Sequence, residues 1–233
     1  MSTALLGRLG LLARPAVLAL ALAALPVKAQ QLVESFANVP ALFSGSWVQM
    51  NRSNPAPDEV TALNGFAQGF APHFPAQGGA PGQYAQVSWR STTSLLTGTI
   101  SNWMITPALN LFNGMQVTFY TRTFTSPHAD RLQLRMSTNG SSTNVGSLPT
   151  DVGDFGTLLL DVNPTLASGG FPTTWTLQTA TVSGLAGPTT GRLAFRYFVT
   201  GAGAGNGPTA PGNYVGIDTL TVTPVTLQSF DVD

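Results

Sequence analysis

The two histidines, His73 and His128, are the natural starting point for acid–base or metal chemistry, because the chain contains no cysteine. Nucleophilic hydrolysis needs a serine or cysteine within reach of a histidine, and the sequence has no G-x-S-x-G elbow. A zinc site needs three or four ligands, and there is no H-E-x-x-H pair. Both histidines lie in proline-containing segments expected to be loops, so we interpret them as structural loop residues and predict no catalytic residue.

The carboxylates allow two further kinds of site. Glycoside hydrolysis needs two carboxylates on facing strands, and any two of Glu34, Asp161 and Asp218 would qualify. No spacing identifies such a pair, so hydrolysis remains an alternative. Asp151 and Asp154 lie in "DVGD", which lacks the EF-hand pattern, and we interpret them as turn-forming residues.

Calcium is the favoured metal, because it binds six to eight oxygens that the loops and strand ends of a β-sandwich supply without a linear motif. Glu34 and Asp218 each interrupt an apolar strand, one at the start of the mature chain and one at its end. Two carboxylates at close range repel unless a cation or proton lies between them. The sequence therefore predicts a structural calcium ion at Glu34 and Asp218. The alternative is that both face solvent or accept backbone hydrogen bonds.

A ligand-binding face is predicted from the polar sides of the strands. Its residues are Tyr120, Arg122, Arg135 and Arg196, beside Phe198. Arginine next to an aromatic ring hydrogen-bonds and stacks on a sugar or peptide. The same residues also make an ordinary sheet face, with arginine stems covering apolar surface.

The elements that must position these residues are short strands. "MQVTFYTRT", "RLQLRMS" and "RLAFRYFVT" alternate apolar and polar residues, as half-buried strands do. Asn113-Gly114 predicts a tight hairpin, so residues 102–124 are expected to form two antiparallel strands. Pro107 cannot donate to a sheet, and we expect a bend at Thr106-Pro107 where the chain passes between sheets.

This pattern predicts an all-β fold, a sandwich of two antiparallel sheets. Residues 53–83, 145–156 and 201–213 are predicted loops, of which the first is long enough to carry function or to be disordered. One helical turn is possible near Asp58 and Glu59. The four tryptophans are expected on strands in the core; they are Trp47, Trp89, Trp103 and Trp175.

The first 29 residues are predicted to be a cleaved signal peptide, with Ala29 and Gln30 flanking the cleavage site. Its apolar stretch of about a dozen residues is shorter than the roughly 20 that span a membrane. Without Arg8, Arg14 and Lys28 the chain keeps 10 − 3 = 7 basic against 10 acidic residues, a net charge of −3. This balance argues against nucleic acid, which requires a basic surface. We therefore expect a secreted, extracellular protein with no membrane span in its mature part.

Several blocks, in order, resemble the choice-of-anchor J domain of secreted bacterial proteins, a family related to the cleaved adhesin domains of haemagglutinin-proteases. They run from Glu34 to Thr223: "ESF", "FPAQGGAPGQYAQVSW", "GTISNWMITPALNL", "VTFYTRT", "DRLQLRMSTNG", "GDFGTLLLDVNP", "PTTGRLAFRYFV" and "NYVGID". The resemblance implies an exported jelly-roll β-sandwich, here residues 30–223, often followed by a sorting tail. Residues 224–233 match no sorting signal, so release from the cell is expected.

The predicted function is a secreted, non-catalytic binding or adhesion domain for an extracellular glycan or protein surface, with a structural calcium ion. Two alternatives remain open: a secreted carboxylate-dependent polysaccharide hydrolase, and a structural component of an extracellular matrix or biofilm.

Overall fold

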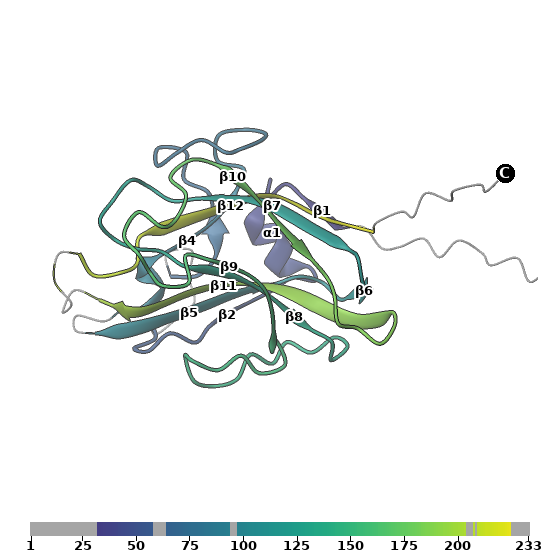
Figure 1. The fold of residues 1–233 in the computed structure, drawn as a ribbon. Helices are drawn as coiled ribbons and strands as arrows, with labels where there is room; N and C mark the ends of the chain where they lie inside the picture. The colour runs from purple at the N-terminus through teal and green to yellow at the C-terminus, as the bar shows by residue number, and fades with distance from the viewer. Residues whose placement is uncertain (1–31, 58–63, 94–96, 204–206, 208, 225–233) are drawn as a thin grey trace, which may run out of the picture.

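The protein is a sandwich of two antiparallel β-sheets, each of six strands (Figure 1). The structure is a computed structural model that describes residues 32–57, 64–93, 97–203, 207 and 209–224. The predicted signal peptide, with its cleavage site at Ala29 and Gln30, therefore lies outside the described residues, as do the tail after Pro224 and the possible helical turn near Asp58. The predicted all-β, two-layer fold is confirmed.

The first sheet has the strand order β10-β7-β12-β4-β3, with β1 also paired to β12. Strands β4 and β1 share one edge of β12, where β4 pairs with Tyr214 to Ile217 and β1 with Leu220 to Val222. Between these two segments the pairing of β12 with β7 shifts register at a β-bulge, and Thr219 has a φ angle of 51°. Its strands are β1 (Leu32–Glu34), β3 (Ala67–Gln68), β4 (Ala85–Ser88), β7 (Gln116–Arg122), β10 (Thr176–Thr181) and β12 (Tyr214–Thr223).

The second sheet has the order β2-β5-β11-β8-β9, and β6 also pairs with β11. Pro107 lies between β5 and β6, where a break was predicted, but both strands pair with β11, so the chain does not pass between sheets there. Between β5 and β6 the chain stays bonded to β11 through Thr106, whose Oγ1 accepts a hydrogen bond from the Leu193 amide at 3.1 Å. The strands are β2 (Val48–Asn51), β5 (Gly98–Ile105), β6 (Leu109–Leu111), β8 (Leu132–Ser137), β9 (Thr157–Val162) and β11 (Thr189–Ala202).

The predicted hairpin at Asn113-Gly114 is wrong in its pairing, although the turn itself exists. Gly114 has a φ angle of 91°, a conformation that glycine adopts without steric cost. However, the strand before the turn, β6, belongs to the second sheet, and the strand after it, β7, belongs to the first. The turn therefore carries the chain across the sandwich.

The main core lies between the sheets and is built by the inward-facing residues that the alternation predicted, such as Phe119 on β7 and Phe195 on β11. These two rings meet edge to face with centroids 4.8 Å apart. A second apolar cluster, around Trp103 and Phe155, covers part of the outer face of the second sheet. A third, around Phe74, covers part of the outer face of the first sheet. Loops thus pack on both outer faces.

Two short helices interrupt the β structure. Helix α1 (Val39–Ser44) was not predicted. Asn38 is its N-cap, and the Asn38 side chain accepts a hydrogen bond from the Ala41 amide at 3.1 Å. The 3-10 helix η1 (Trp89–Ser91) follows β4 directly. In the described part of the chain, no helix has the length and apolar character needed to cross a bilayer.

Candidate functional site

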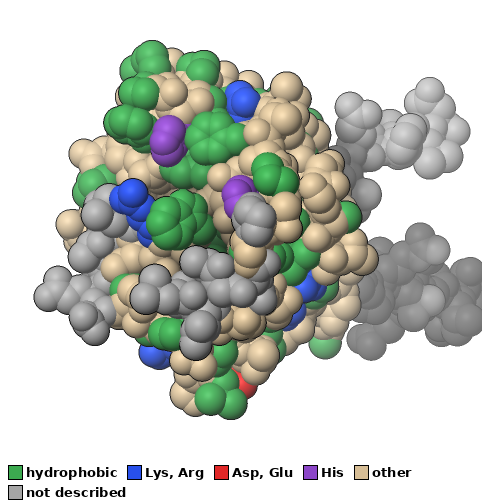
Figure 2. Space-filling view, turned by 90° about the vertical axis from the view of Figure 1, so that its left-hand side faces the viewer, with side chains coloured by type: hydrophobic (Ala, Val, Ile, Leu, Met, Phe, Trp, Pro, Cys, Tyr) green, Lys and Arg blue, Asp and Glu red, His purple; other side chains and the backbone are tan. Residues whose placement is uncertain are grey.

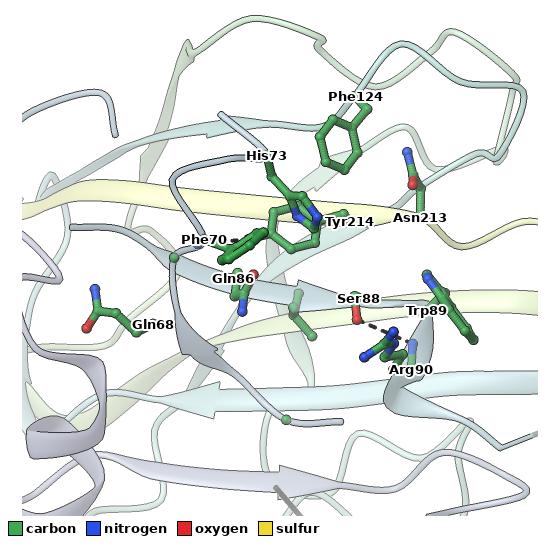
Figure 3. Close-up of a pocket in the computed structure, with 13 residues that line it drawn as sticks. Gln68, Phe70, His73, Gln86, Ser88, Trp89, Arg90, Phe124, Asn213 and Tyr214 are labelled. Carbon is green, nitrogen blue, oxygen red and sulfur yellow. Dashed lines mark hydrogen bonds between the residues drawn. The ribbon is translucent and has the colours of Figure 1, made fainter. Parts of the chain in front are cut away.

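An open pocket of about 530 Å³ lies on the outer side of the first sheet, at the junction of β4 and β12. This volume is within the range of roughly 300–1,000 Å³ found for small-molecule sites. Four separate segments line it: the end of β3 and the following loop, β4 with η1, Phe124 after β7, and the start of β12. Its side chains, which Figure 3 shows, are those of Gln68, Phe70, His73, Gln86, Val87, Ser88, Trp89, Arg90, Phe124, Asn213 and Tyr214.

One side of the pocket is formed by Trp89 and Arg90, which η1 turns away from the sheet. The Ser88 side chain accepts a hydrogen bond from the Arg90 amide at 3.4 Å, and Ser91 Oγ donates to the Ser88 carbonyl at 2.8 Å. Serine favours such caps and turns over strand continuation. Trp89 is consequently 54% exposed, so its prediction as a core residue is wrong.

The opposite side of the pocket is formed by Phe70 and His73, which a tight turn holds together. The His73 amide donates to the Phe70 carbonyl at 2.9 Å. The His73 ring makes edge-to-face contacts with Phe70, Phe124 and Tyr214, at centroid distances of 4.9, 4.9 and 4.4 Å. His73, predicted to be a loop residue without further role, is therefore fixed among three aromatic rings at the pocket.

Two buried tyrosines, Tyr84 and Tyr214, anchor this turn to the sheet. Their hydroxyl oxygens lie 3.0 Å apart, and Tyr84 Oη donates to the Phe70 carbonyl at 3.0 Å. Burial raises the pKa of both hydroxyl groups. Gly69 is required next to this pair, because a Cβ atom there would overlap the Tyr84 ring. The backbone of Phe70 is therefore held rigidly.

Asn213 reaches the pocket from a network centred on the buried carboxylate of Asp130. This carboxylate accepts hydrogen bonds from Thr123 Oγ1 at 2.6 Å, Tyr197 Oη at 2.6 Å and the Asn213 amide at 2.8 Å. The Asn213 side chain donates to Ser126 Oγ at 2.9 Å. Burial raises the pKa of Asp130, and the hydrogen bonds act against that rise. The sequence analysis did not identify Asp130, because nothing local marks it as buried.

The described residues that line the pocket include no aspartate or glutamate, and Arg90 is their one formally charged residue. Burial and, to a smaller extent, the charge of Arg90 lower the pKa of His73 below 6.5. Figure 2 shows this end of the molecule, where hydrophobic and basic side chains surround the histidines and little acidic surface is visible. The pocket therefore presents aromatic rings, amides and a cation.

The predicted calcium ligands lie on neighbouring strands, but their side chains are engaged separately. Glu34 pairs with Leu220 of β12 and accepts the Phe36 amide at 2.7 Å. Asp218 lies on the outer-facing side of β12, opposite Tyr120. Its oxygens accept the amides of Gln77 at 2.8 Å, Gly78 at 3.2 Å and Thr219 at 2.7 Å.

Amide donors place hydrogen where a cation would need oxygen ligands, so the surroundings of Asp218 do not fit calcium. Burial raises the pKa of Asp218, and these amides oppose the rise. Within the described ranges, no group of three or more histidine, aspartate or glutamate residues could hold a metal. Calcium remains an untested prediction, and the alternative in which the carboxylates accept backbone hydrogen bonds describes the observed geometry.

The four predicted ligand-binding residues do not form one face, because they lie on opposite outer sides of the sandwich. Tyr120 and Arg122 belong to β7 of the first sheet, whereas Arg135 and Arg196 belong to β8 and β11 of the second. Arg122 is covered: its guanidinium lies 4.3 Å from the Phe74 ring and donates to a backbone carbonyl.

Arg196 is buried rather than available for a ligand, with only 1% of its surface exposed. Its guanidinium lies 4.8 Å from the Trp103 ring and 3.9 Å from the Phe198 ring, and it donates to the Pro149 carbonyl at 2.5 Å. Burial lowers its pKa to about 9. Arg135, beside it, donates to Gln133 at 2.9 Å and to the Phe155 carbonyl at 3.1 Å. Because Pro149 and Phe155 lie in the loop that precedes β9, both arginines attach this loop to the second sheet.

The remaining predicted residues have structural partners. Asp161 forms an ion pair with Arg131, with N–O distances of 2.9 and 2.6 Å. Asp151 and Asp154 stabilise the loop that precedes β9, as predicted, through hydrogen bonds to backbone amides and neighbouring side chains. His128 Nδ1 lies 2.7 Å from the Ala210 carbonyl.

The other three tryptophans differ in burial. Trp47 and Trp103 are buried, as predicted. Trp175 is only partly buried and donates to the Pro75 carbonyl at 2.9 Å.

Comparison with known proteins supports the fold. No protein-family model and no curated protein matches this chain. Among solved structures, the K1 cleaved adhesin domain of Lys-gingipain from Porphyromonas gingivalis is similar, with a TM-score of 0.53 and 22% identity over 84% of this chain and 99% of that domain. The K2 cleaved adhesin domain of Lys-gingipain gives a TM-score of 0.51 and 16% identity over 83% and 99% of the two chains.

These likenesses show a shared β-sandwich and fit the predicted relation to cleaved adhesin domains at the level of fold. They do not show the choice-of-anchor J family, which stays a prediction.

Proposed function

We propose that this chain is a secreted, non-catalytic binding domain that holds a glycan in the pocket between Phe70 and Trp89. The observation that carries the proposal is the exposed ring of Trp89 beside the polar side chains of Gln86, Ser88 and Asn213. An aromatic ring offers an apolar face for the C–H groups of a sugar, while amides and hydroxyls bind its hydroxyl groups.

The rigidity of the pocket supports the same function. The Phe70 backbone is held by Tyr84 and Tyr214, and Asn213 by the Asp130 network. A site fixed before the ligand arrives loses less conformational entropy on binding. The fold likeness to domains named cleaved adhesin domains is compatible with a binding role outside the cell.

The hydrolase alternative has no specific observation in its favour. Asp161 lies in the second sheet and Glu34 and Asp218 in the first. The described lining of the pocket contributes no carboxylate to act as acid, base or nucleophile.

Titration of the purified mature domain with oligosaccharides chosen from a glycan array tests the proposal. Trp89→Ala should weaken binding by roughly five- to thirtyfold, because stacking on an aromatic ring contributes on the order of 1–2 kcal/mol. Leu177→Ala is the matched control, because Leu177 is 51% exposed and lies on β10, outside the pocket. Equal affinities of wild type and Trp89→Ala, or no glycan bound, would refute the proposal.

A further inference from the structure

The arginines of this protein differ in whether their guanidinium groups are already occupied. Most of them donate to fixed acceptors inside the domain: Arg122 to Thr173, Arg131 to Asp161, Arg135 to Gln133 and Phe155, Arg192 to Ser141 and Thr106, and Arg196 to Ser101, Gln133 and Pro149. Arg52 and Arg90 are different: within the described residues, no acceptor or carboxylate engages either guanidinium, and of the two Arg90 lines the pocket. The guanidinium carbon of Arg90 lies 5.4 Å from the centroid of the Trp89 ring.

The position of Arg90 places this unpaired guanidinium at the pocket. It follows β4 on η1 and lines the pocket together with Trp89. In Figure 3, Trp89 and Arg90 lie on one side of the pocket and Phe70 and His73 on the other, with Gln86 below Phe70. No carboxylate among the described lining residues neutralises Arg90. Its charge acts across the pocket, since it contributes to the lowered pKa of His73.

Two amide side chains line the pocket, those of Gln86 and Asn213. Gln86 Oε1 has no hydrogen-bond donor among the described residues but is shielded from solvent, so a ligand hydroxyl reaches it only when the Gln86 side chain turns into the pocket. An unsatisfied buried carbonyl is costly, which favours that turn when a donor is present. The Asn213 side chain is held through its nitrogen by Ser126 and Thr123, which leaves its oxygen as an acceptor.

We propose that the pocket selects glycans that carry a carboxylate, the chemistry of hexuronic acids, and that Arg90 binds this carboxylate while the sugar ring stacks on Trp89. This inference rests on the proposed function and specifies the ligand class of the same site. A guanidinium is planar and presents parallel N–H donors that match a carboxylate. The ring contacts carry no charge preference, so the selectivity comes from Arg90.

The experiment compares uronic-acid oligosaccharides with the same oligosaccharides after carboxyl reduction, which converts each uronic acid to its neutral hexose. The panel contains oligogalacturonate, oligoglucuronate and oligomannuronate, each with its reduced counterpart. Four proteins are titrated by calorimetry: wild type, Arg90→Gln, Trp89→Ala and Arg52→Gln. Arg52 is an exposed arginine outside the pocket, so its substitution removes the same charge without changing the site.

We expect wild type and Arg52→Gln to bind at least one uronate about tenfold or more tightly than its reduced counterpart, the scale of one charge-assisted contact. Arg90→Gln should bind both forms alike and lose the salt dependence of binding. Trp89→Ala should weaken both forms.

The outcomes separate this inference from the proposed function. If wild type and Arg90→Gln bind reduced and unreduced glycans equally, while Trp89→Ala weakens both, the acidic-sugar inference is wrong and the glycan-binding function stands. If neither form binds, or Trp89→Ala changes nothing, both are wrong. Equal losses in Arg52→Gln and Arg90→Gln would show a general charge effect and also overturn the inference.

Discussion

Replacing Asp130 with asparagine should destabilise the domain strongly, because one buried carboxylate holds three donors from three separate segments. Thr123 and Tyr197 donate at 2.6 Å each and the Asn213 amide at 2.8 Å. Asparagine keeps one acceptor oxygen and turns an NH₂ group towards a donor. The side chain of Asp130 has no access to solvent, so water cannot compensate.

The size of the effect follows from these contacts. Three hydrogen bonds to a charged acceptor contribute about 1.5–3 kcal/mol each. Burial of the carboxylate, which raises the pKa of Asp130, offsets part of this sum. We therefore expect Asp130→Asn to lower the free energy of unfolding by about 2–4 kcal/mol, which for a domain of this size lowers Tm by roughly 5–15 °C.

Thermal and urea unfolding followed by circular dichroism measure this change. Tyr197→Phe removes one of the three donors and should cost about 1–2 kcal/mol. Asp154→Asn is the control, because this carboxylate lies in a surface loop where water can replace its hydrogen bonds to Ser142 and Asn139, so the change should lower Tm less than Asp130→Asn does. If Asp130→Asn unfolded within about 2 °C of wild type, the network would not hold the loops as argued.

Three further changes test other parts of the structure. Burial lowers the pKa of His73, so the stability linked to this group is complete above its unfolded pKa of 6.5 and is lost as pH falls through the lower folded pKa. Between pH 7.5 and 5, the free energy of unfolding of wild type should therefore fall more than that of His73→Gln. Urea unfolding at each pH measures this, and equal falls in the two proteins would contradict it. Gly216→Ala should cost about 1–3 kcal/mol, measured by urea unfolding, because its Cβ would lie 2.8 Å from atoms of the Phe74 and Trp175 rings. Chelator should leave Tm unchanged, because amides already occupy the oxygens of Asp218; a fall in Tm would instead support the predicted calcium ion.

The alternation of apolar residues predicted which side chains face the core, but not which strands pair. On β11, Phe195 and Tyr197 face inward as expected, because this pattern is fixed by the local geometry of a strand. Pairing depends on residues far away in the sequence. The turn at Gly114 was predicted correctly, yet β6 and β7 join different sheets, because β6 pairs with β11 and β7 pairs with β12.

The outward-facing residues were predicted to form a polar sheet face. Loops cover part of that face, so some of these residues are buried. Arg196 faces outward on β11 as expected, but the loop before β9 covers it and supplies the carbonyl of Pro149. Across the sheet Arg196 is in register with Trp103 on one side and Gln133 on the other. Residues 93 and 63 positions away in the chain thus form one row, which no local pattern reveals.

The sequence analysis did not locate the pocket for the same reason, although one local motif marked part of its wall. Its walls come from segments around residues 70, 88, 124 and 213, and no spacing connects them. That motif is "SWRS", where Ser88 and Ser91 flank Trp89. A serine that caps the next turn is a signal that a strand ends, and it would have placed Trp89 outside the core.

Arg122 and Arg90 illustrate why residue type alone does not locate a binding site. Both lie close to aromatic rings on the same sheet, and Arg122 was the one predicted to contact a ligand. Its guanidinium is held between Phe74 and Trp175, at 4.3 and 5.9 Å from their centroids, and donates to a carbonyl. It therefore supports the loop that carries His73. Arg90, on η1, keeps its donors, because no acceptor among the described residues engages its guanidinium. A residue can bind a ligand only with hydrogen-bonding capacity that the fold has not already used.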